Sequence, residues 1–321
     1  MLKILKLLQK NLILSIPIFM VLGLLFGFLF QTSFLKSWIV PLTFLMVYPM
    51  MVTLNMEELI SKSNNKIQTT AIIINFAITP FIGYFIGKLV FPDNPLVVLG
   101  LLLTSLLPTS GMTISWTGFA KGNMSAAVKM TIIGLIVGSL ATPLYLKALM
   151  GTVVSISLIE VFSQIISIVF LPLIAGYLTQ IFLKKRYGVE IYENKYKPKF
   201  PLLSTIGVLG VVFISMALKS KTILSNPVII LYYLIPLIIL YVINFAVSTI
   251  IGKVFFNRED GIALVYGTVM RNLSIALAIA MGVFGEKGSE IALIIALAYV
   301  IQVQAAAWYV KFTDMIFGEA L

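Results

Sequence analysis

The chain alternates long apolar runs with short polar connections, and the apolar runs have the length of membrane-spanning helices. A helix needs roughly 20 apolar residues to cross the hydrocarbon core of a bilayer. This pattern predicts ten spans, at 12–30, 38–54, 67–90, 96–120, 125–149, 153–183, 202–218, 228–255, 262–284 and 289–312. The predicted fold class is therefore an all-α integral membrane protein. Because the first run is long and is soon followed by a second, we do not expect a cleaved signal peptide and expect the chain to be mature.

Two of these predicted spans contain polar residues near their middle. In the fourth, Pro108 lacks an amide hydrogen and frees the carbonyl four residues back, while Gly111 lets the chain take unusual backbone dihedrals. In the ninth, Arg271 lies about ten residues from either end, where a charge costs roughly 2.5–3.5 kcal/mol on insertion scales. Corresponding broken helices are typical of substrate sites in secondary transporters, where freed carbonyls and hydroxyls suit a cation and exposed amides suit an anion.

Each break also has a purely structural interpretation. The fourth span would then contain a proline kink whose hydroxyls bond back to their own helix. Arg271 would form an ion pair with a buried acid, and Glu160 is the acid that lies well inside an apolar run. Amide side chains in other spans would only join helices. The sequence leaves both interpretations open.

An internal repeat supports the functional interpretation. The segment "INFAITPFIGYFIGKLVF" (74–91) is similar to "INFAVSTIIGKVFF" (243–256), and each is followed by one of the two broken spans. The matched segments lie in the third and eighth predicted spans, an odd number apart, so they run in opposite directions through the membrane. This order predicts two inverted-topology repeats of five helices, residues 1–151 and 152–321, that form a single transport unit.

Composition and charge narrow the classes of function. The 321 residues include no cysteine and no histidine, which excludes disulfides, thiolate or imidazole metal sites and triads that need either residue. The net charge of +11 is distributed as in a membrane protein, so we expect no nucleic acid partner. Sixteen of the 23 lysines and arginines fall in segments on one side of the ten spans and six on the other. The positive-inside rule therefore predicts a multi-pass protein of the cytoplasmic membrane with both termini cytoplasmic.

The longest charged connection, "KKRYGVEIYENKYKPKF" at 184–200, follows the sixth predicted span on the cytoplasmic side. One interpretation is an ordinary positive-inside anchor. The other is a site for anionic lipid headgroups or for a regulator.

The candidate substrate- or ion-binding residues come from the two breaks and from amides in the matched and last spans. They are Asn75, Pro108, Thr109, Ser110, Gly111, Met112, Thr113, Ser115, Trp116, Thr117, Asn244, Arg271, Asn272, Ser274, Gln302 and Gln304. A guanidinium at this depth binds a carboxylate or another oxyanion through two parallel hydrogen bonds. No catalytic residue, metal ligand or cofactor is predicted.

At these residues the chain resembles the superfamily that joins bile acid:sodium symporters with arsenite efflux transporters. The stretch "PTSGMTISWTGFAKGN" (108–123) matches the crossing fourth helix of both branches, and "RNLSIALAIAMGVFG" (271–285) resembles their ninth-helix motif. The features that are more similar to the arsenite branch are Met112, Trp116, Thr117 and the pair Asn75-Phe76 followed by Pro80. The resemblance covers essentially the whole chain and implies ten spans in two inverted halves.

The chain also departs from both branches. Thr109 stands where the arsenite branch has a cysteine that is thought to handle arsenic. Where the sodium-coupled branch has a Ser-Asn pair, this chain has Thr113-Ile114; Gly267 replaces a glutamate and Arg271 a glutamine. The resemblance therefore implies that sodium ligands are missing, and Arg271 is a hypothetical replacement for the sodium charge.

These observations favour a secondary transporter that works by alternating access. Arsenite, or a related small solute or anion, is the leading substrate, with export that is not sodium-coupled in the usual way; a sodium- or proton-coupled transporter of small organic anions is the alternative. The expected partners are the substrate, a coupling proton or sodium ion, and membrane lipids. A channel would need a continuous polar pore, and an intramembrane enzyme would need a nucleophile and base at recognisable spacing; the sequence shows neither.

Overall fold

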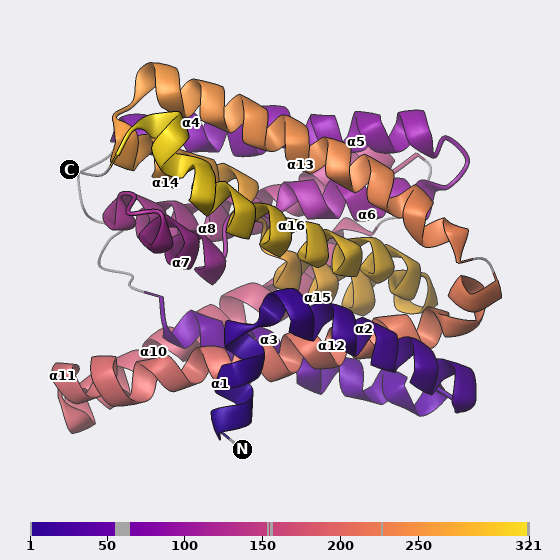
Figure 1. The fold of residues 1–321 in the computed structure, drawn as a ribbon. Helices are drawn as coiled ribbons and strands as arrows, with labels where there is room; N and C mark the ends of the chain where they lie inside the picture. The colour runs from indigo at the N-terminus through magenta and orange to yellow at the C-terminus, as the bar shows by residue number, and fades with distance from the viewer. Residues whose placement is uncertain (1, 55–64, 153, 155–156, 226, 320–321) are drawn as a thin grey trace. The chain divides into compact units, whose positions relative to one another are not determined.

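The computed structural model describes residues 2–54, 65–152, 154, 157–225 and 227–319 (Figure 1). Every regular element in these ranges is a helix. The α-helices are α1 (Leu2–Lys10), α2 (Leu12–Leu29), α3 (Ile39–Val52), α4 (Asn65–Ile72), α5 (Thr79–Val90), α6 (Pro95–Leu106), α7 (Gly111–Phe119), α8 (Met124–Met150), α9 (Leu158–Ile165), α10 (Leu171–Tyr187), α11 (Val189–Ile191), α12 (Phe200–Ser225), α13 (Val228–Phe255), α14 (Arg258–Val269), α15 (Leu273–Val283) and α16 (Gly288–Phe317). Short 3-10 helices are η1 (Ser33–Trp38), η6 (Lys197–Lys199) and η7 (Gly285–Lys287), and π-helices are η3 (Ile73–Ile78), η4 (Ile166–Phe170) and η5 (Tyr192–Tyr196).

Seven of the described helices are long and apolar enough to cross a membrane. They are Ser33–Val52, Asn65–Val90, Met124–Met150, Leu158–Tyr187, Val189–Lys221, Val228–Phe255 and Gly288–Phe317. In the most apolar part of Val228–Phe255 only 33% of residues are buried, so most of this stretch is left for contact with lipid. The chain is a multi-pass membrane protein.

The three remaining predicted spans correspond to shorter helices. Residues 12–30 give the short apolar helix Leu14–Leu29, and the fourth and ninth predicted spans are each divided in two. The predicted span 153–183 begins at residues 153 and 155–156, which lie outside the described residues; its helix is present from Leu158. The inverted repeat of five and five helices stays a prediction.

The chain forms two compact units, and each draws on both halves of the sequence. The first unit contains Met1–Leu54, Ile159–Ile230 and Ser274–Ala296. The second contains Asn55–Leu158, Leu231–Leu273 and Leu297–Leu321. The predicted division into five-helix repeats at 1–151 and 152–321 also stays a prediction.

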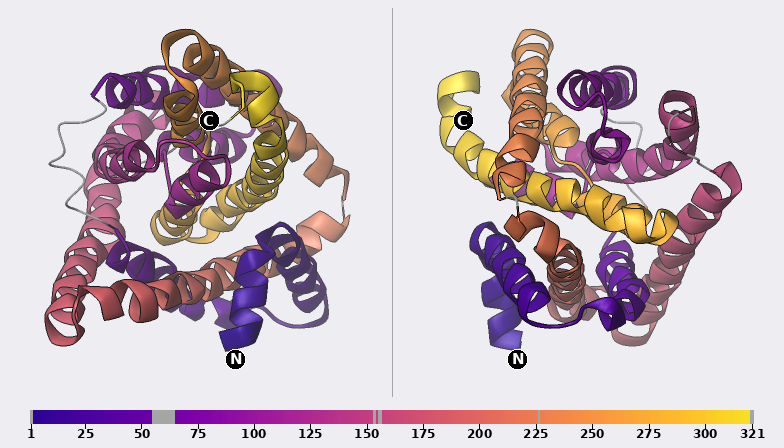
Figure 2. Two further views of the ribbon diagram at one scale, coloured as in Figure 1. Left: turned by 60° about the vertical axis from the view of Figure 1, so that its left-hand side comes forward. Right: turned by 90° about the vertical axis from the view of Figure 1, so that its right-hand side faces the viewer.

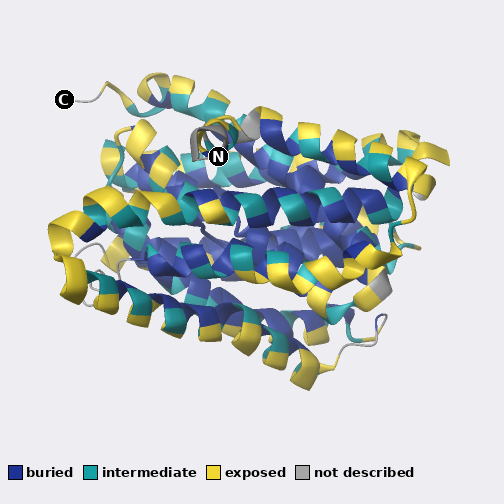
Figure 3. Ribbon diagram, turned by 90° about the horizontal axis from the view of Figure 1, so that it is seen from below, coloured by how far each residue is buried: buried dark blue, intermediate teal, exposed yellow. Residues whose placement is uncertain are grey.

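In the first unit, α12 packs along α2 and α3, and α10 packs along α3 (Figure 2). The close approach of α2 to α12 requires a residue without a side chain, because a methyl group at Gly27 would lie 2.1 Å from the carbonyl oxygen of Ala217. Single helices carry buried and exposed stripes side by side (Figure 3). This striping is typical of helices that contact protein on one face and lipid or water on the other.

In the second unit, α14 packs against α4, α7 and α8, and α5 packs against α6. Polar side chains fix where these helices begin. Asn123 accepts a hydrogen bond from the amide of Ala126 at 3.0 Å and caps α8, and Asn257 accepts from the amide of Asp260 at 2.8 Å and caps α14. An apolar cluster then holds α4, α8 and α14 together; it consists of Ile67, Ala71, Ile74, Ala126, Met130, Ala263 and Leu264.

Both predicted breaks are present in the structure. The first separates α6, which ends at Leu106, from α7, which begins at Gly111; the second separates α14, which ends at Val269, from α15, which begins at Leu273. One expectation about the first break was wrong. The residue with a left-handed backbone is Thr109, with φ of 62°, and Gly111 does not have a positive φ. A β-branched residue in this region is strained by about 1–3 kcal/mol, so the surrounding contacts must hold it there.

Candidate functional site

The two breaks pair with each other through their backbones. The amide of Thr109 donates to the carbonyl of Met270, and the amide of Asn272 donates to the carbonyl of Leu107, both at 2.7 Å. Pro108 and Arg271 thereby face each other in a short antiparallel bridge. In an apolar surrounding an unpaired backbone group costs several kcal/mol, and this pairing satisfies groups that each break alone would leave open.

Asparagines from the two repeat-matched segments satisfy the last carbonyls of α14. The Nδ2 atom of Asn75 donates to the carbonyl of Gly267 at 3.0 Å, and that of Asn244 donates to the adjacent carbonyl of Thr268 at 3.3 Å. The last turn of a helix has carbonyls without helical partners, and the break leaves no further turn to supply them. The two matched asparagines therefore meet at the end of one half-helix.

Gln302 of α16 holds the backbone of Arg271. Its Oε1 atom accepts from the amide of Arg271 at 2.7 Å, and its Nε2 atom donates to the carbonyl of the same residue at 3.2 Å. The hydroxyl of Tyr241 on α13 donates to the same Oε1 at 2.8 Å. An amide side chain thus takes the place of a neighbouring strand, and the backbone at residue 271 is fully paired.

The side chain of Arg271 is treated differently. It is 2% exposed, and its Nη1 atom donates to Oδ1 of Asn75 at 3.0 Å. The Nε and Nη2 atoms are buried without a hydrogen-bond partner. Among the described residues no ion pair is formed by this guanidinium, and Glu160, its predicted structural partner, belongs to the first unit. We call the Nε and Nη2 atoms the free edge of Arg271.

Most hydroxyl side chains at the first break form hydrogen bonds with backbone groups. Ser110 and Thr113 form a reciprocal capping box at the start of α7: Ser110 Oγ accepts from the amide of Met112, and Thr113 Oγ1 accepts from the amide of Ser110, both at 3.2 Å. The hydroxyl of Thr109 points to carbonyls, with Pro108 O at 2.6 Å and Thr131 O at 3.3 Å. These contacts hold the strained turn and place the start of α7 next to the break.

The other candidate residues on α7 differ in exposure. Thr117 is fully buried and its hydroxyl has no partner. Ser115 is exposed and donates back to the carbonyl of Gly111 at 3.3 Å. Met112 and Trp116 are half-buried, and the indole of Trp116 packs edge-on against the ring of Phe119 at 5.6 Å. Of these, Thr117 alone adds an unpaired buried polar atom.

Two further candidates are Gln304 and Ser274. Gln304 is half-buried two residues beyond Gln302, and residues two apart on a helix point in different directions. Ser274 is buried and lies where the first unit resumes, one residue into α15. Whether any of the sixteen candidates touches substrate stays a prediction.

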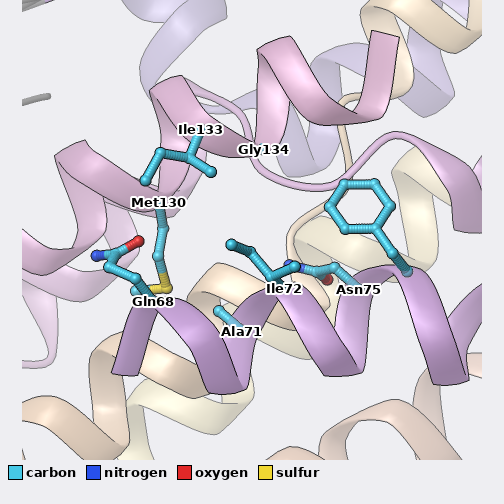
Figure 4. A pocket seen from close by; sticks show the side chains of 8 residues that line it. Gln68, Ala71, Ile72, Asn75, Met130, Ile133 and Gly134 are labelled. Atoms are coloured by element: carbon cyan, nitrogen blue, oxygen red, sulfur yellow. The ribbon is translucent and has the colours of Figure 1, made fainter. Parts of the chain in front are cut away.

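A small cavity of about 10 Å³, the space of roughly one water molecule, lies beside Asn75 between α4–η3 and α8. Gln68 and Asn75 line it from α4 and η3, and Met130, Ile133 and Gly134 line it from α8 (Figure 4). The Oε1 atom of Gln68 is buried without a partner. α8 can pack this closely only with glycine at residue 134, because a methyl group there would lie 2.5 Å from the hydroxyl oxygen of Thr109.

The sequence pattern did not identify several residues that organise the site. Tyr241 orients Gln302, and Thr79 donates to Oδ1 of Asn244 at 3.0 Å and so fixes that amide. Thr268 donates to Ser248 at 2.6 Å. The sequence could have indicated these residues, because each lies one helical turn from one of the two matched asparagines or next to a break. Among the described residues no group of histidine, cysteine or carboxylate side chains is arranged to hold a metal.

Among the described residues around the bridge, the free edge of Arg271 is the charged recognition element. The backbone groups at the bridge and the amides around it are paired, so the site is held in place without a ligand. The free edge of Arg271 carries two adjacent donors on a rigid plane, which matches the two oxygens of a carboxylate or other oxyanion. An anion at this edge would offset the desolvation of the guanidinium.

Comparison with known proteins agrees with the resemblance seen in the sequence. The model of the sodium bile acid symporter family matches residues 39–226, a range that includes the first break and ends before Arg271. An arsenical-resistance protein Acr3 of Corynebacterium glutamicum is 24% identical over 258 residues, which cover 76% of this chain and 70% of the relative.

Two further relatives show the spread of the similarity. A second arsenical-resistance protein Acr3, of Alkaliphilus metalliredigens, is 28% identical over 211 residues; these cover 62% of this chain and 59% of the relative, less than two thirds of its length. A protein of Bacillus subtilis named as the uncharacterised sodium-dependent transporter YocS is 25% identical over 272 residues, 82% of this chain and 79% of the relative. Because the family match covers more than half of the chain, this protein belongs to the sodium bile acid symporter family and is a membrane transporter, not an enzyme.

Proposed function

We propose that the chain is a secondary transporter that carries a small oxyanion or its uncharged oxyacid across the cytoplasmic membrane by alternating access, with arsenite, which is mostly the acid As(OH)3 at neutral pH, as the leading substrate. The observation that carries this proposal is the free edge of Arg271: a buried guanidinium with two unpaired donors beside a paired backbone bridge. A charge left unpaired at this depth is expensive, and function is the usual reason for keeping one.

In the proposed binding mode the substrate supplies the hydrogen-bond acceptors that Nε and Nη2 of Arg271 lack in the protein. Asn75 occupies Nη1 and leaves Nε and Nη2 for two oxygens of the substrate. The start of α7, capped by Ser110, contributes the positive end of a half-helix on the neighbouring chain segment. Both elements favour negative charge, so the site selects an oxyanion over a cation.

The same guanidinium supports transport without sodium. In the resemblance that the sequence shows, sodium ligands of related proteins correspond to Thr113-Ile114, Gly267 and Arg271, which cannot supply the same carboxylate and amide oxygens. A fixed positive charge at residue 271 replaces the coupling cation. For a substrate that is transported in its ionised form, such as a carboxylate, the inside-negative potential then favours export by roughly 2.3 kcal/mol per charge per 100 mV. The lysines and arginines of the predicted loops support cytoplasmic termini.

A second candidate is transport of small organic carboxylates, coupled to a proton or sodium. The observation that favours it is Thr109, which stands at the cysteine position of the arsenite branch and directs its hydroxyl to backbone carbonyls. Without a thiol, a planar carboxylate fits the free edge of Arg271 as well as arsenite does.

Uptake into everted membrane vesicles tests the proposal. Arsenite and acetate are offered with and without sodium to the native protein, to Arg271→Gln and to Arg271→Lys, with equal amounts of folded protein in each membrane. We expect arsenite uptake without sodium that falls at least about tenfold in both variants, because neither keeps two donors on one plane. Uptake of acetate alone, with the same dependence on Arg271, would select the second candidate. Undiminished uptake by Arg271→Gln would overturn both.

A further inference from the structure

The charged segment 184–199, which we call the basic tip, joins two candidate spans of the first unit. Residues 184–187 end the candidate span Leu158–Tyr187, and residues 189–199 begin the candidate span Val189–Lys221. In Figure 1 its helix α11 lies at the end of the hairpin formed by α10 and α12. A segment that joins the ends of two membrane-spanning helices lies at the boundary between hydrocarbon and water, the level of the lipid headgroups.

Buried contacts hold the basic tip in one conformation. Tyr192 is fully buried, and its hydroxyl donates to the carbonyl of Val52 at the end of α3 at 2.7 Å. Gln180 on α10 donates to the same hydroxyl at 3.1 Å, and the ammonium of Lys184 lies 5.6 Å from the centre of the Tyr192 ring. The chain turns at Gly188, whose φ of 85° favours glycine. The basic tip is therefore an anchored hairpin and not a loose tether.

The outer side of this hairpin carries excess positive charge. Residues 184–199 contain six lysines and arginines against two glutamates, a net charge of +4. Lys185, Arg186, Lys195 and Lys199 are exposed. One of the glutamates, Glu193, already pairs with Lys197 at 2.6 Å. Four exposed cations on a fixed frame complement a negatively charged surface.

Apolar and aromatic side chains are exposed among these charges. Val189 is 60% exposed and Ile191 is 46% exposed, at the turn of the hairpin. The ring centres of Tyr187 and Tyr196 lie 4.8 Å apart with the planes tilted by 32°, and the guanidinium of Arg186 lies 5.9 Å from the centre of the Tyr187 ring. Aliphatic side chains flanked by tyrosines and cations are typical of protein surfaces that enter the headgroup layer.

We propose that the basic tip binds the headgroups of anionic phospholipids, with Val189 and Ile191 inserted between the headgroups and the exposed cations on the phosphates. An ordinary positive-inside anchor needs only charge in a connection between spans. The fixed conformation and the exposed aliphatic residues instead form a surface with a defined lipid contact. The location at the end of two spans favours lipid over a soluble acidic protein as the partner.

Titration of the purified full-length protein with short-chain phosphatidylglycerol, followed by native mass spectrometry, tests this proposal. We expect saturable binding that weakens by about 25-fold in the double variant Lys185→Gln with Lys195→Gln, from roughly fivefold per cation. Both residues are exposed, so the variant is expected to fold normally. Val189→Ser with Ile191→Ser, which keeps every charge, should also weaken binding. The matched control is Lys253→Gln, an exposed lysine at the end of α13 in the second unit, which should bind as the native protein does.

Several results would overturn the proposal. Equal binding of phosphatidylcholine would remove the role of charge. An equal loss in Lys253→Gln would show a general effect of positive charge and no special surface. If inorganic phosphate at the same concentration displaced phosphatidylglycerol, the site would recognise free phosphate and not a lipid. If the basic tip bound a soluble acidic protein and no phosphatidylglycerol, its partner would be a regulator.

Discussion

Two arginines of the second unit are treated in opposite ways. Arg258, at the start of α14, donates to the carbonyl of Gly318 at 2.7 Å and to that of Lys121 at 3.1 Å, and pairs with the carboxylate of Asp314. Arg271, beyond the end of the same helix, is 2% exposed, and the only acceptor that its side chain contacts among the described residues is the neutral amide oxygen of Asn75. The charge near the surface, where pairing matters least, is fully paired, and the charge in the interior, where pairing matters most, is not. This contrast indicates that Arg258 has a structural role and that Arg271 keeps its free edge for a ligand.

Replacement of Arg271 by glutamine should have the largest effect. Transport efficiency is expected to fall about 100-fold, because the two charge-assisted hydrogen bonds to the oxyanion are lost. Stability should stay the same or rise, because the substitution removes an uncompensated buried charge. Vesicle uptake and thermal unfolding in detergent measure the two effects. A large loss of stability together with the loss of transport would show that Arg271 is structural, like Arg258.

The second prediction concerns a variant in which Arg271 has a carboxylate partner, as Arg258 has in Asp314. Asn75→Asp places a carboxylate on the guanidinium and competes with the substrate, so uptake should fall about 30-fold. Asn244→Asp is the matched control, since this asparagine occupies the corresponding position of the repeat and contacts Thr79 and Thr268. Equal losses in the two variants would contradict a specific role for the free edge of Arg271.

The third prediction separates the backbone of Arg271 from its side chain. Gln302→Leu removes both hydrogen bonds to that backbone and should lower the free energy of unfolding by about 2 kcal/mol. Gln304→Leu, on another face of the same helix, should change it by less than about 0.5 kcal/mol. Chemical denaturation measures both. If Gln304→Leu proved the more damaging, the bridge between the breaks would not depend on Gln302.

The smallest effect is expected at Arg258. Arg258→Gln should destabilise the protein by about 1 kcal/mol, because its contacts with Asp314 and Gly318 are partly exposed. Uptake per folded molecule should change less than about threefold, because the residue does not contact the bridge. A tenfold loss of uptake at unchanged stability would remove the contrast between the two arginines.

The sequence predicted where the helices break but not how the breaks are held. A proline or an arginine within an apolar run disturbs a membrane-spanning helix at that residue. Pro108 and Arg271 therefore indicated the positions of the two breaks from the sequence alone. The pairing of Thr109 with Met270, and of Asn75 with Arg271 across 196 residues of chain, depends on tertiary packing that no local pattern encodes. The left-handed Thr109 reversed the expectation for Gly111, because tertiary hydrogen bonds there outweighed backbone preference. The sequence pattern also gave no sign of the π-helix η3 that contains Asn75.

Equilibrium binding to the purified full-length protein tests the central claim most directly. Labelled arsenite and acetate are titrated against the native protein and against Arg271→Lys, which keeps the positive charge and loses the free edge. We predict saturable binding of at least one anion by the native protein and an affinity at least about tenfold lower in the variant. If Arg271→Lys binds the same anion as tightly as the native protein, the free edge of Arg271 is not the binding element, and the account is wrong.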